Sequence, residues 1–208
     1  MRRASARGKC AEDALEGGHP GPQRSQAART DPEDAAARST ELCAHVLAEA
    51  RWRAATSVAA FVGVKGEPDT RPLLIAALAA GKQLWLPRMA GPRRQHIEFV
   101  AVTDLVALAP APFGLLEPRE GPGVALAETD VDLVLMPGLA FTRTGVRLGY
   151  GKAHYDGAMA PLRTLSRPVR VGLCFSDELV EALPEEPHDV GVHALATELG
   201  LIDCVSLQ

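Results

Sequence analysis

The chain has 208 residues, of which 47% are hydrophobic and 23% are charged, a composition typical of a soluble globular protein built around one core. A formal net charge of −4 argues against a protein whose main task is to bind nucleic acid, because that task requires a concentrated basic surface. No apolar run approaches the roughly 20 residues that span a bilayer, and we therefore expect no membrane segment.

The beginning of the chain differs in composition from the rest. Residues 1–39 are polar and charged, with Gly-Gly and Gly-Pro breakers, and they cannot nucleate a core alone. We predict a polar N-terminal extension over 1–39, with the composition of a disordered segment, followed by an α/β domain over 40–208. A helix is predicted to begin with Thr30 or Asp31 as its cap and Pro32 in its first turn.

Strand and helix patterns then alternate along the chain. A short apolar run over 57–64 predicts a strand, and residues 70–80 show helical spacing that ends at Gly81. A second strand is predicted over 83–87, and a more exposed one over 96–102. Helices that alternate with buried strands indicate a mainly parallel sheet covered on both faces.

The second half of the chain contains the clearest buried strand, at 132–136. The preceding segment 112–118, rich in Pro and Gly, is predicted to be an ordered loop. The run 170–175 is predicted to be the last core strand, and residues 192–201 are expected to return to the surface of the sheet.

A glycine-rich loop follows the strand at 132–136 and precedes a helix predicted to begin near Tyr155. Gly149 and Gly151 supply a turn whose backbone N–H groups can meet phosphate oxygens at the carboxyl end of a strand. Arg147 and Lys152 lie on either side of these glycines, as expected of a phosphate clamp.

Asp156 follows the loop at the start of the helix. A carboxylate beside two cations and a phosphate is well placed to hold magnesium, which prefers one or two carboxylates together with phosphate oxygens. Because the spacing G-x-G is common in proteins, the pattern alone also allows a generic phosphate-binding α/β protein.

The full string MPGLAFTRTGVRLGYGKAHYD resembles the C-terminal signature of the 5-formyltetrahydrofolate cyclo-ligase family, also called methenyltetrahydrofolate synthetase, PGxAFDxxGxRLGxGxGYYD. Further segments resemble the family in the family's own order, and together they cover about residues 55–198. These segments are GEPDTRPLL, LWLPRM, IEF, PFGLLEP and VGLCFSDELVEALPEEPHDVGVHALATE.

The resemblance implies the cyclo-ligase fold, a three-layer α/β/α fold with a central, mostly parallel sheet that is related to the CoA-transferase-like architecture. It also implies a reaction in which ATP and Mg²⁺ convert 5-formyltetrahydrofolate to 5,10-methenyltetrahydrofolate, with release of ADP and phosphate. The expected partners are these small molecules only, with no nucleic acid and no membrane. We expect a monomer.

The resemblance assigns roles to particular residues. Arg147 and Lys152 match the catalytic positions that neutralise the moving phosphoryl group. Asp156 and Asp189 match candidate magnesium ligands. The segment matched to ATP binding is Arg147, Leu148, Gly149, Tyr150, Gly151, Lys152, Ala153, His154 and Tyr155. The residues matched to the folate are Glu67, which contacts the pterin side, with Val62, Met89 and Phe113 around it.

The chain departs from the family pattern at several places. Ala153 and His154 stand where the family has a glycine and a tyrosine, and His193 replaces an aspartate. The string EGGHPGPQ stands where the family has a Lys-x-x-x-Arg helix that reaches the ATP phosphates. The replacement at His193 is compatible with activity, whereas EGGHPGPQ, Ala153 and His154 favour an alternative, a non-catalytic or repurposed family homologue that binds nucleotide or folate without efficient turnover.

The four cysteines of the chain are too widely spaced to form a CxxC pair. They signal neither a zinc site nor a disulfide framework, as is usual for proteins of a reducing cytoplasm. The opening string MRRASARGKC carries basic charges without the apolar stretch of a secretory signal. We therefore expect a cytoplasmic protein. The cysteines are Cys10, Cys43, Cys174 and Cys204.

Overall fold

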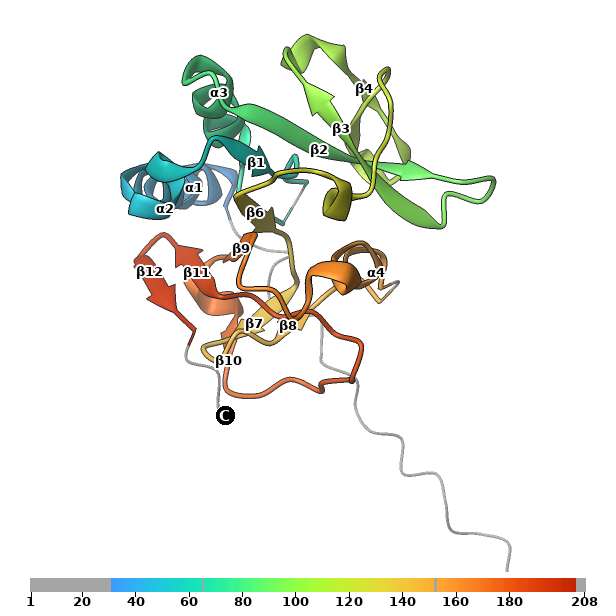
Figure 1. The fold of residues 1–208 in the computed structure, drawn as a ribbon. Coiled ribbons are helices and arrows are strands. Elements are labelled where there is room, and N and C mark those ends of the chain that lie inside the picture. Colours follow the sequence, from blue (N-terminus) through green and yellow to red (C-terminus); the bar gives the residue numbers. More distant parts are fainter. Residues whose placement is uncertain (1–30, 65, 152, 205–208) are drawn as a thin grey trace, which may run out of the picture.

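The computed structural model describes residues 31–64, 66–151 and 153–204, and Figure 1 shows its fold. Lys152 lies outside the described residues, as do residues 1–30 of the predicted extension. The predicted boundary between residues 39 and 40 falls inside the first helix, α1 (Pro32–Ala48). Within the described ranges, no helix is both long enough and apolar enough to cross a membrane.

A seven-stranded sheet forms the centre of the molecule, in the order β12-β11-β9-β6-β1-β2-β3. The five inner strands are parallel, whereas β12 and β3 pair antiparallel with their neighbours at the two edges. The predicted mostly parallel sheet is thus confirmed. The strands are β1 (Ser57–Ala59), β2 (Gln83–Ala90), β3 (His96–Val102), β6 (Leu133–Met136), β9 (Val169–Leu173), β11 (Ala194–Thr197) and β12 (Gly200–Asp203).

The first helix begins where the sequence predicts. Asp31 caps α1 by accepting a hydrogen bond from the backbone N–H of Glu33 (3.1 Å), and Pro32 occupies the first turn. The helical pattern is interrupted at Glu49, whose ψ of 137° is extended, and continues as α2 (Ala50–Ala54). The interruption turns the chain toward β1.

The remaining helices are short. The predicted helix after β1 is confirmed as α3 (Arg71–Ala79), and Gly81 follows it with φ of +70°, the left-handed conformation expected of a helix end. Helix α4 (His154–Met159) begins one residue before the expected Tyr155. Five single turns of 3₁₀ helix complete the helical structure of the described chain: η1 (Leu105–Ala107), η2 (Pro112–Gly114), η3 (Leu126–Glu128), η4 (Ala160–Leu162) and η5 (Ser176–Glu178).

Two hydrophobic cores lie on opposite faces of the sheet and give the molecule three layers. Alternate residues of β6 show the division, since Leu133 and Leu135 join the core beneath α1 and α3, whereas Val134 and Met136 join the core beneath α4. The three-layer α/β/α fold predicted from the resemblance is therefore present.

Two small sheets add elements that the sequence analysis did not predict. Segment 112–118, predicted to be a loop, contains β5 (Leu116–Pro118), which pairs with β4 (Leu108–Pro110). Within the glycine-rich segment, β7 (Ala140–Thr142) pairs with β8 (Arg147–Leu148) and with β10 (Leu179–Val180). These strands have two or three residues, too short to show a hydrophobic period.

The expectation for residues 192–201 is wrong. Ala194–Thr197 form the fully buried strand β11, which pairs parallel with β9 inside the central sheet, so that β9 is not the last core strand. The run Ala-Leu-Ala-Thr has a single β-branched residue, Thr197, and is therefore a weak strand signal; its pairing between β9 and β12 buries it in the sheet.

Candidate active site

The carboxyl ends of the parallel strands meet at one edge of the sheet, where open α/β folds bind their ligands. Five loops leave the sheet at this edge, after β1, β2, β6, β9 and β11. The loop after β6 contains the glycine-rich segment, and the loop after β1 contains Glu67. This edge therefore brings the predicted nucleotide and folate segments to the same side of the molecule.

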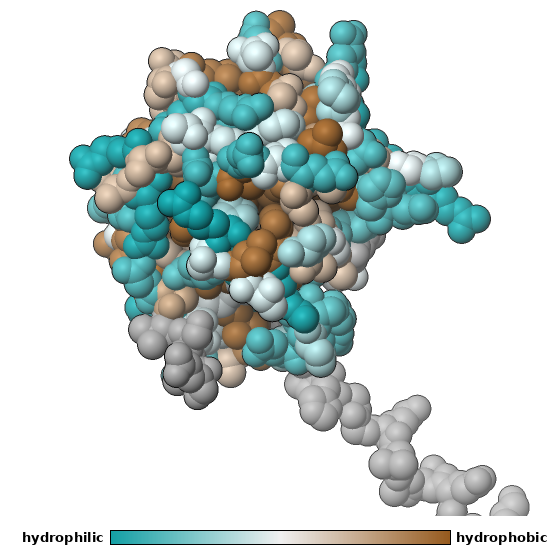
Figure 2. Space-filling model, in the orientation of Figure 1, coloured by the Kyte–Doolittle hydropathy of each residue, from teal (hydrophilic) through white to brown (hydrophobic). Residues whose placement is uncertain are grey.

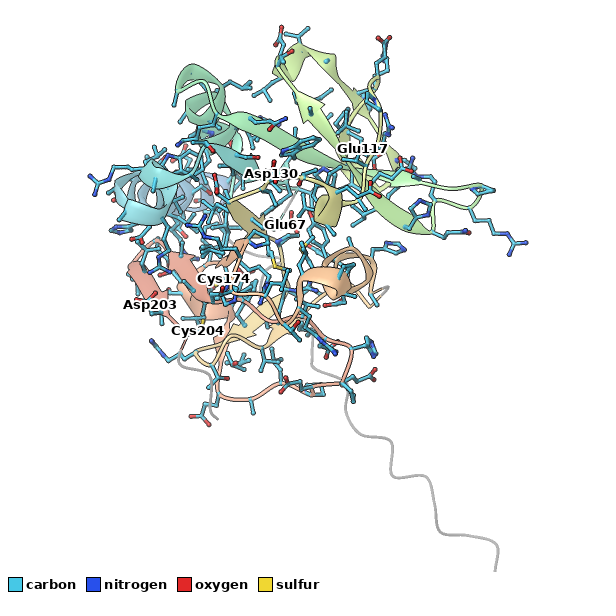
Figure 3. All side chains as sticks on the ribbon, in the orientation of Figure 1. Glu67, Glu117, Asp130, Cys174, Asp203 and Cys204 are labelled. Carbon is cyan, nitrogen blue, oxygen red and sulfur yellow. The ribbon has the colours of Figure 1, made fainter. Side chains whose placement is uncertain are left out.

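The Glu67 carboxylate joins two of these loops. One oxygen, Oε2, accepts a hydrogen bond from the backbone N–H of Val64 (3.0 Å), and the other, Oε1, accepts one from the Tyr150 hydroxyl (2.6 Å). In Figure 3 Glu67 lies near the middle of the molecule, whereas the labelled Glu117 lies out toward the β4 hairpin. Burial raises the pKa of Glu67, and the two hydrogen bonds oppose that rise.

A second carboxylate, Glu178, lies in the loop after β9. Its Oε2 accepts a hydrogen bond from the backbone N–H of Phe175 (2.8 Å). Burial raises the pKa of Glu178 to about 7, and the negative charges of Asp177 and Glu67 add to the rise. Glu178 thus titrates near neutral pH at the edge where the site lies.

The glycine-rich loop has the backbone conformations that its sequence predicts. Gly151 has φ of +78°, and a side chain at Gly149 would approach the Arg147 guanidinium to 2.9 Å. Ala153 also adopts the left-handed region, with φ of +48°, although alanine carries the Cβ that makes this conformation unfavourable. Ala153 therefore holds a backbone shape that suits glycine.

Arg147 is turned into the protein. Its side chain is only 3% exposed, and it donates to Asp156 Oδ1 (2.6 Å) and to the carbonyl oxygen of Pro137 (3.4 Å). The guanidinium carbon lies 6.0 Å from the centre of the Tyr155 ring. Its Nε has no hydrogen-bond partner among the described residues. Of the two cations of the expected phosphate clamp, Arg147 is thus engaged with the protein itself, and its Nε–H group is unsatisfied among the described residues.

The two predicted magnesium ligands lie on segments that touch. Asp156 Oδ1 accepts a hydrogen bond from the backbone N–H of Val190 (3.2 Å), the residue after Asp189. Asp189 itself accepts from the backbone N–H of Glu186 (2.8 Å). No group of three metal-binding side chains occurs in the described part of the chain. This donor set fits a magnesium ion bound chiefly through nucleotide phosphates with one or two carboxylates.

The other predicted folate residues occupy varied surroundings. Val62 is buried in the core beneath α1 and α3, just after β1. Met89 lies on the part of β2 that extends beyond the end of β1 and pairs with Ile97 of β3. Phe113, between β4 and β5, is 86% exposed. Met89 and Phe113 therefore belong to the hairpins beside the site rather than to its base.

The remaining predicted ATP residues are His154, Leu148 and Tyr155. His154 is the first residue of α4 and is half-buried, as is Leu148 in β8. Tyr155 packs against the core beneath α4, and burial raises the pKa of its hydroxyl.

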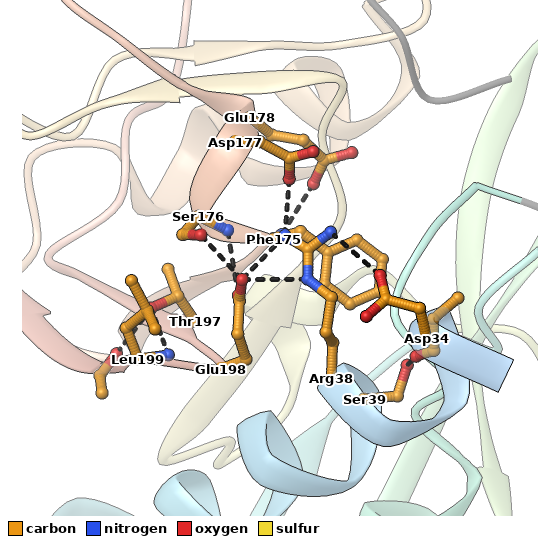
Figure 4. Close-up of polar contacts among 12 residues, drawn as sticks. Asp34, Arg38, Ser39, Phe175, Ser176, Asp177, Glu178, Thr197, Glu198 and Leu199 are labelled. Carbon is orange, nitrogen blue, oxygen red and sulfur yellow. Dashed lines mark hydrogen bonds and ion pairs between the residues drawn. The ribbon is translucent and has the colours of Figure 1, made fainter. Parts of the chain in front are cut away.

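One cluster at this edge was not predicted. Arg38 of α1 donates to Glu198 Oε1 (2.7 Å) and to Asp177 (2.6 Å), and its guanidinium lies 4.3 Å above the Phe175 ring, as Figure 4 shows. Ser176 donates to Glu198 through both its backbone N–H and its hydroxyl. Burial raises the pKa of Glu198, but these hydrogen bonds together hold it below its usual value.

The sequence contained a partial signal for this cluster. Glu198 follows β11 directly and Ser176 lies three residues after the end of β9, as expected for polar side chains at the carboxyl edge of a parallel sheet. Arg38 comes from a helix 160 residues before Glu198. Helical spacing could place Arg38 on a face of α1 but could not identify its partner.

Comparison with known proteins adds independent findings. Residues 23–198 match the family model of the 5-formyltetrahydrofolate cyclo-ligase family. A 5-formyltetrahydrofolate cyclo-ligase of Mycolicibacterium smegmatis is 35% identical over 154 residues, which cover 70% of this chain and 76% of that one. A probable 5-formyltetrahydrofolate cyclo-ligase of Schizosaccharomyces pombe is 27% identical over 171 residues, covering 77% and 83%.

Solved structures agree with the fold. The NMR structure of Aquifex aeolicus 5,10-methenyltetrahydrofolate synthetase superposes with a TM-score of 0.72 and 29% identity, covering 86% of this chain and 87% of that one. A 5,10-methenyltetrahydrofolate synthetase from Mycoplasma pneumoniae, at 14% identity, superposes with a TM-score of 0.63 over 83% of this chain and 92% of that one. Because its sequence identity is only 14%, this second match supports the fold alone.

Proposed function

The chain belongs to the 5-formyltetrahydrofolate cyclo-ligase family, and from this membership we propose that it catalyses the ATP-dependent conversion of 5-formyltetrahydrofolate to 5,10-methenyltetrahydrofolate, with release of ADP and phosphate. The observation that carries the proposal is the meeting of Glu67 and Tyr150, because it joins the folate segment and the ATP segment of the family pattern across one site.

The chemistry needs activation of a poor leaving group. The formyl oxygen attacks the γ-phosphorus of ATP, the bond from that phosphorus to the bridging oxygen breaks, and ADP leaves. Nitrogen 10 of the folate then attacks the formyl carbon and loses its proton. The C–O bond breaks, and phosphate departs with the former formyl oxygen. Each step moves negative charge over phosphoryl oxygens, and cations and backbone N–H groups placed beside these oxygens lower its barrier.

In this proposal the segment 147–155 binds ATP, with Arg147 and Lys152 as the catalytic cations. Arg147 reaches a phosphate only if its guanidinium exchanges the Asp156 carboxylate for phosphate oxygens, and its unsatisfied Nε offers a further donor for that contact. Glu67 accepts hydrogen bonds from the pterin side of the folate. Val62, Met89 and Phe113 line the remainder of the folate site.

We also propose that Asp156 and Asp189 hold the magnesium ion of the Mg-ATP complex. The ion would supply positive charge that offsets the developing charge of the phosphoryl group. Asp156 is paired with Arg147 in the structure, and the exchange that turns Arg147 toward phosphate would free its carboxylate for the ion. Chelation of magnesium with excess EDTA is expected to abolish turnover, and added MgCl₂ to restore it, as followed by product absorbance.

The proposal includes a monomer that works in the cytoplasm. On the face of the molecule shown in Figure 2, hydrophobic residues are scattered among hydrophilic ones, and the projecting hairpin of β2 and β3 is hydrophilic. This face offers no broad apolar patch for a second copy of the chain. Sedimentation of the purified protein measures the mass that tests this point.

A direct assay tests the function. Purified protein is mixed with 5-formyltetrahydrofolate and Mg-ATP, and the ultraviolet absorbance of the methenyl product is followed with time. We expect product to accumulate with one ADP released for each molecule formed. Retained nucleotide or folate binding without product would instead favour the alternative of a non-catalytic homologue, for which the left-handed Ala153 is the supporting observation.

The substitution Lys152→Ala provides a second test of the proposal that the protein is an active cyclo-ligase. If Lys152 acts as one preorganised phosphate donor, its loss raises the barrier by about 2 to 4 kcal/mol, which lowers kcat by about 30- to 1000-fold. The midpoint of thermal unfolding is expected to stay nearly unchanged, because a lysine in a polar, glycine-rich sequence is expected to contribute little to folding. A large loss of stability with unchanged kcat would show a structural role instead.

A further inference from the structure

We propose that Tyr150 is a positioning residue for folate recognition, whose hydroxyl holds the Glu67 carboxylate in the orientation that receives the substrate. The proposal rests on the proposed function, because that function makes Glu67 the acid that contacts the folate. It deepens the function by adding a residue that acts on the folate from the ATP-binding loop.

The contact between the two residues is short and spans the site. The Tyr150 hydroxyl donates to Glu67 Oε1 at 2.6 Å, a distance typical of a hydrogen bond to an ionised oxygen. The two residues are 83 positions apart in sequence. One belongs to the loop after β1, and the other belongs to the glycine-rich loop before α4. A single hydroxyl therefore ties the folate segment to the ATP segment.

The Tyr150 bond completes the restraint on the carboxylate. Glu67 Oε2 is held by the backbone N–H of Val64, and the backbone N–H of Glu67 in turn donates to the Val64 carbonyl. This local turn fixes one oxygen, whereas only the Tyr150 bond restrains the other among the contacts described for Glu67. A carboxylate has about four acceptor positions, and the two that remain can accept N–H donors of a ligand.

The charges around Glu67 make this bond important. Burial raises the pKa of Glu67, and the Tyr150 hydrogen bond is the larger of the two contributions that lower it. Among the described residues, Tyr155 of α4 and Glu178 of η5 also interact electrostatically with Glu67. Neither supplies a positive charge, and the Tyr150 hydroxyl is therefore the main side-chain support for the ionised form.

Tyr150→Phe removes this hydroxyl and keeps the ring. We expect the KM for 5-formyltetrahydrofolate to rise by about 5- to 30-fold, at or below the low end of the range for a hydrogen bond to a charged acceptor, because Tyr150 is 57% exposed. We expect kcat and the KM for ATP to change less than about twofold, because the ring still occupies its place in the loop. The acidic limb of kcat/KM for the folate should move to higher pH, since the loss of a donor raises the pKa of Glu67 further.

Two controls separate positioning from a structural effect. Tyr150→Phe should unfold at the wild-type urea midpoint, and Thr40→Val, which removes an exposed hydroxyl from α1, should change no kinetic constant. In a Glu67→Gln background the Tyr150 substitution should add less than about twofold to the KM, because its partner charge is already gone. The same ratio of affinities should appear in calorimetric binding of 5-formyltetrahydrofolate without ATP.

The outcomes distinguish the two proposals. Equal increases in the KM for both substrates, or full additivity with Glu67→Gln, would overturn the role of Tyr150 while the enzyme remains a cyclo-ligase. An unchanged folate KM in the Tyr150 variant would overturn it as well. A wild-type protein that neither turns over nor binds 5-formyltetrahydrofolate would overturn the proposed function, and with it this inference.

Discussion

Ala153 holds a left-handed backbone with φ of +48°, and no described contact of its methyl group offsets that conformation. Replacement by glycine is expected to stabilise the fold by about 1 kcal/mol, because glycine adopts this conformation without the clash of Cβ against the backbone. Urea unfolding at pH 7 measures the difference. A lower midpoint for Ala153→Gly would mean that the methyl group makes packing contacts of greater value than the strain.

Arg170 of β9 is a buried cation without a carboxylate among its described partners. Its guanidinium donates to the carbonyl oxygens of Gly191 and Leu162 and faces His193 Nε2 (2.9 Å). The backbone N–H of Arg170 also donates to His193 Nδ1 (2.9 Å). A neutral imidazole has one acceptor nitrogen, and it cannot satisfy two donors at once. A carboxylate at the position of His193 could accept hydrogen bonds from both the backbone N–H and the guanidinium of Arg170.

This pair predicts a dependence of stability on pH. Burial lowers the pKa of His193 below its usual value of 6.5, and the charge of Arg170 lowers it further. His193 therefore takes up a proton more readily in the unfolded chain than in the folded protein. Its contribution to the free energy of unfolding is fully present above pH 6.5 and is lost as the pH falls below that value.

Comparison of the wild type with His193→Asp checks this prediction. We expect the variant to have the higher urea midpoint, by an amount that grows between pH 7.5 and pH 5.5, because an aspartate presents two acceptor oxygens to Arg170. A difference that is constant over this range would exclude titration of His193 as the cause.

At the scale of elements, the Arg38 cluster fastens α1 to the ends of β9 and β11. The Arg38 side chain is 17% exposed and the Glu198 side chain 11%, and a partner left alone there keeps a poorly solvated charge. Arg38→Met is therefore expected to lower the free energy of unfolding by about 2 to 3 kcal/mol at pH 7. Arg53→Met, on the exposed side of α2, should change it by less than about 0.5 kcal/mol.

A second arm of this experiment isolates the ion pair. Glu198→Gln in the Arg38→Met background should cost less than the same change in the wild type, because no charge remains to be paired. Urea unfolding of the four proteins gives the coupling energy directly. Additive losses would show that Arg38 stabilises α1 by packing on Phe175 rather than by pairing.

The elements differ in how far their sequences predict them. The cap at Asp31 and the strand β3 (His96–Val102) follow from local chemistry, and the structure confirms both. Strand β11 and the small strand β7 depend on neighbours that are distant in sequence. Their three or four residues are too few to show a strand pattern, and local reasoning therefore placed β11 at the surface and missed β7.

The site shows the same division. The sequence pattern predicts the roles of the glycine-rich loop and of Glu67. It also predicts that both lie at the carboxyl edge of the sheet. The side-chain orientations do not follow from it. Arg147 turns inward because Asp156, nine residues later, lies within 2.6 Å, and Arg38 reaches the site only through the packing of α1 on the sheet.

At the scale of the whole molecule, the central sheet contributes one face to each of the two cores. Trp52 belongs to the core beneath α1 and α3, and Trp85 packs against the core beneath α4. Because every inner strand contributes to both faces, we expect the two cores to unfold together in one transition.

The two tryptophans allow this to be measured. In Trp52→Phe and in Trp85→Phe the remaining indole reports on one core, since the chain has 2 tryptophans. Within each variant, the fluorescence midpoint in urea should coincide with the midpoint from far-ultraviolet circular dichroism. A separation of the two midpoints in either variant would show that the cores unfold independently.

The direction of the strands also fixes where the two ends of the described chain emerge. Helix α1 begins near Arg38 and Glu198, at the carboxyl edge of the sheet, whereas β12 runs antiparallel to β11 and ends at Asp203, at the amino edge. Attachment of the protein to a sensor chip or resin through its carboxyl terminus therefore leaves the mouth of the site open to solution. Attachment at the start of α1, the first described helix, would place the support at the same edge as the proposed site.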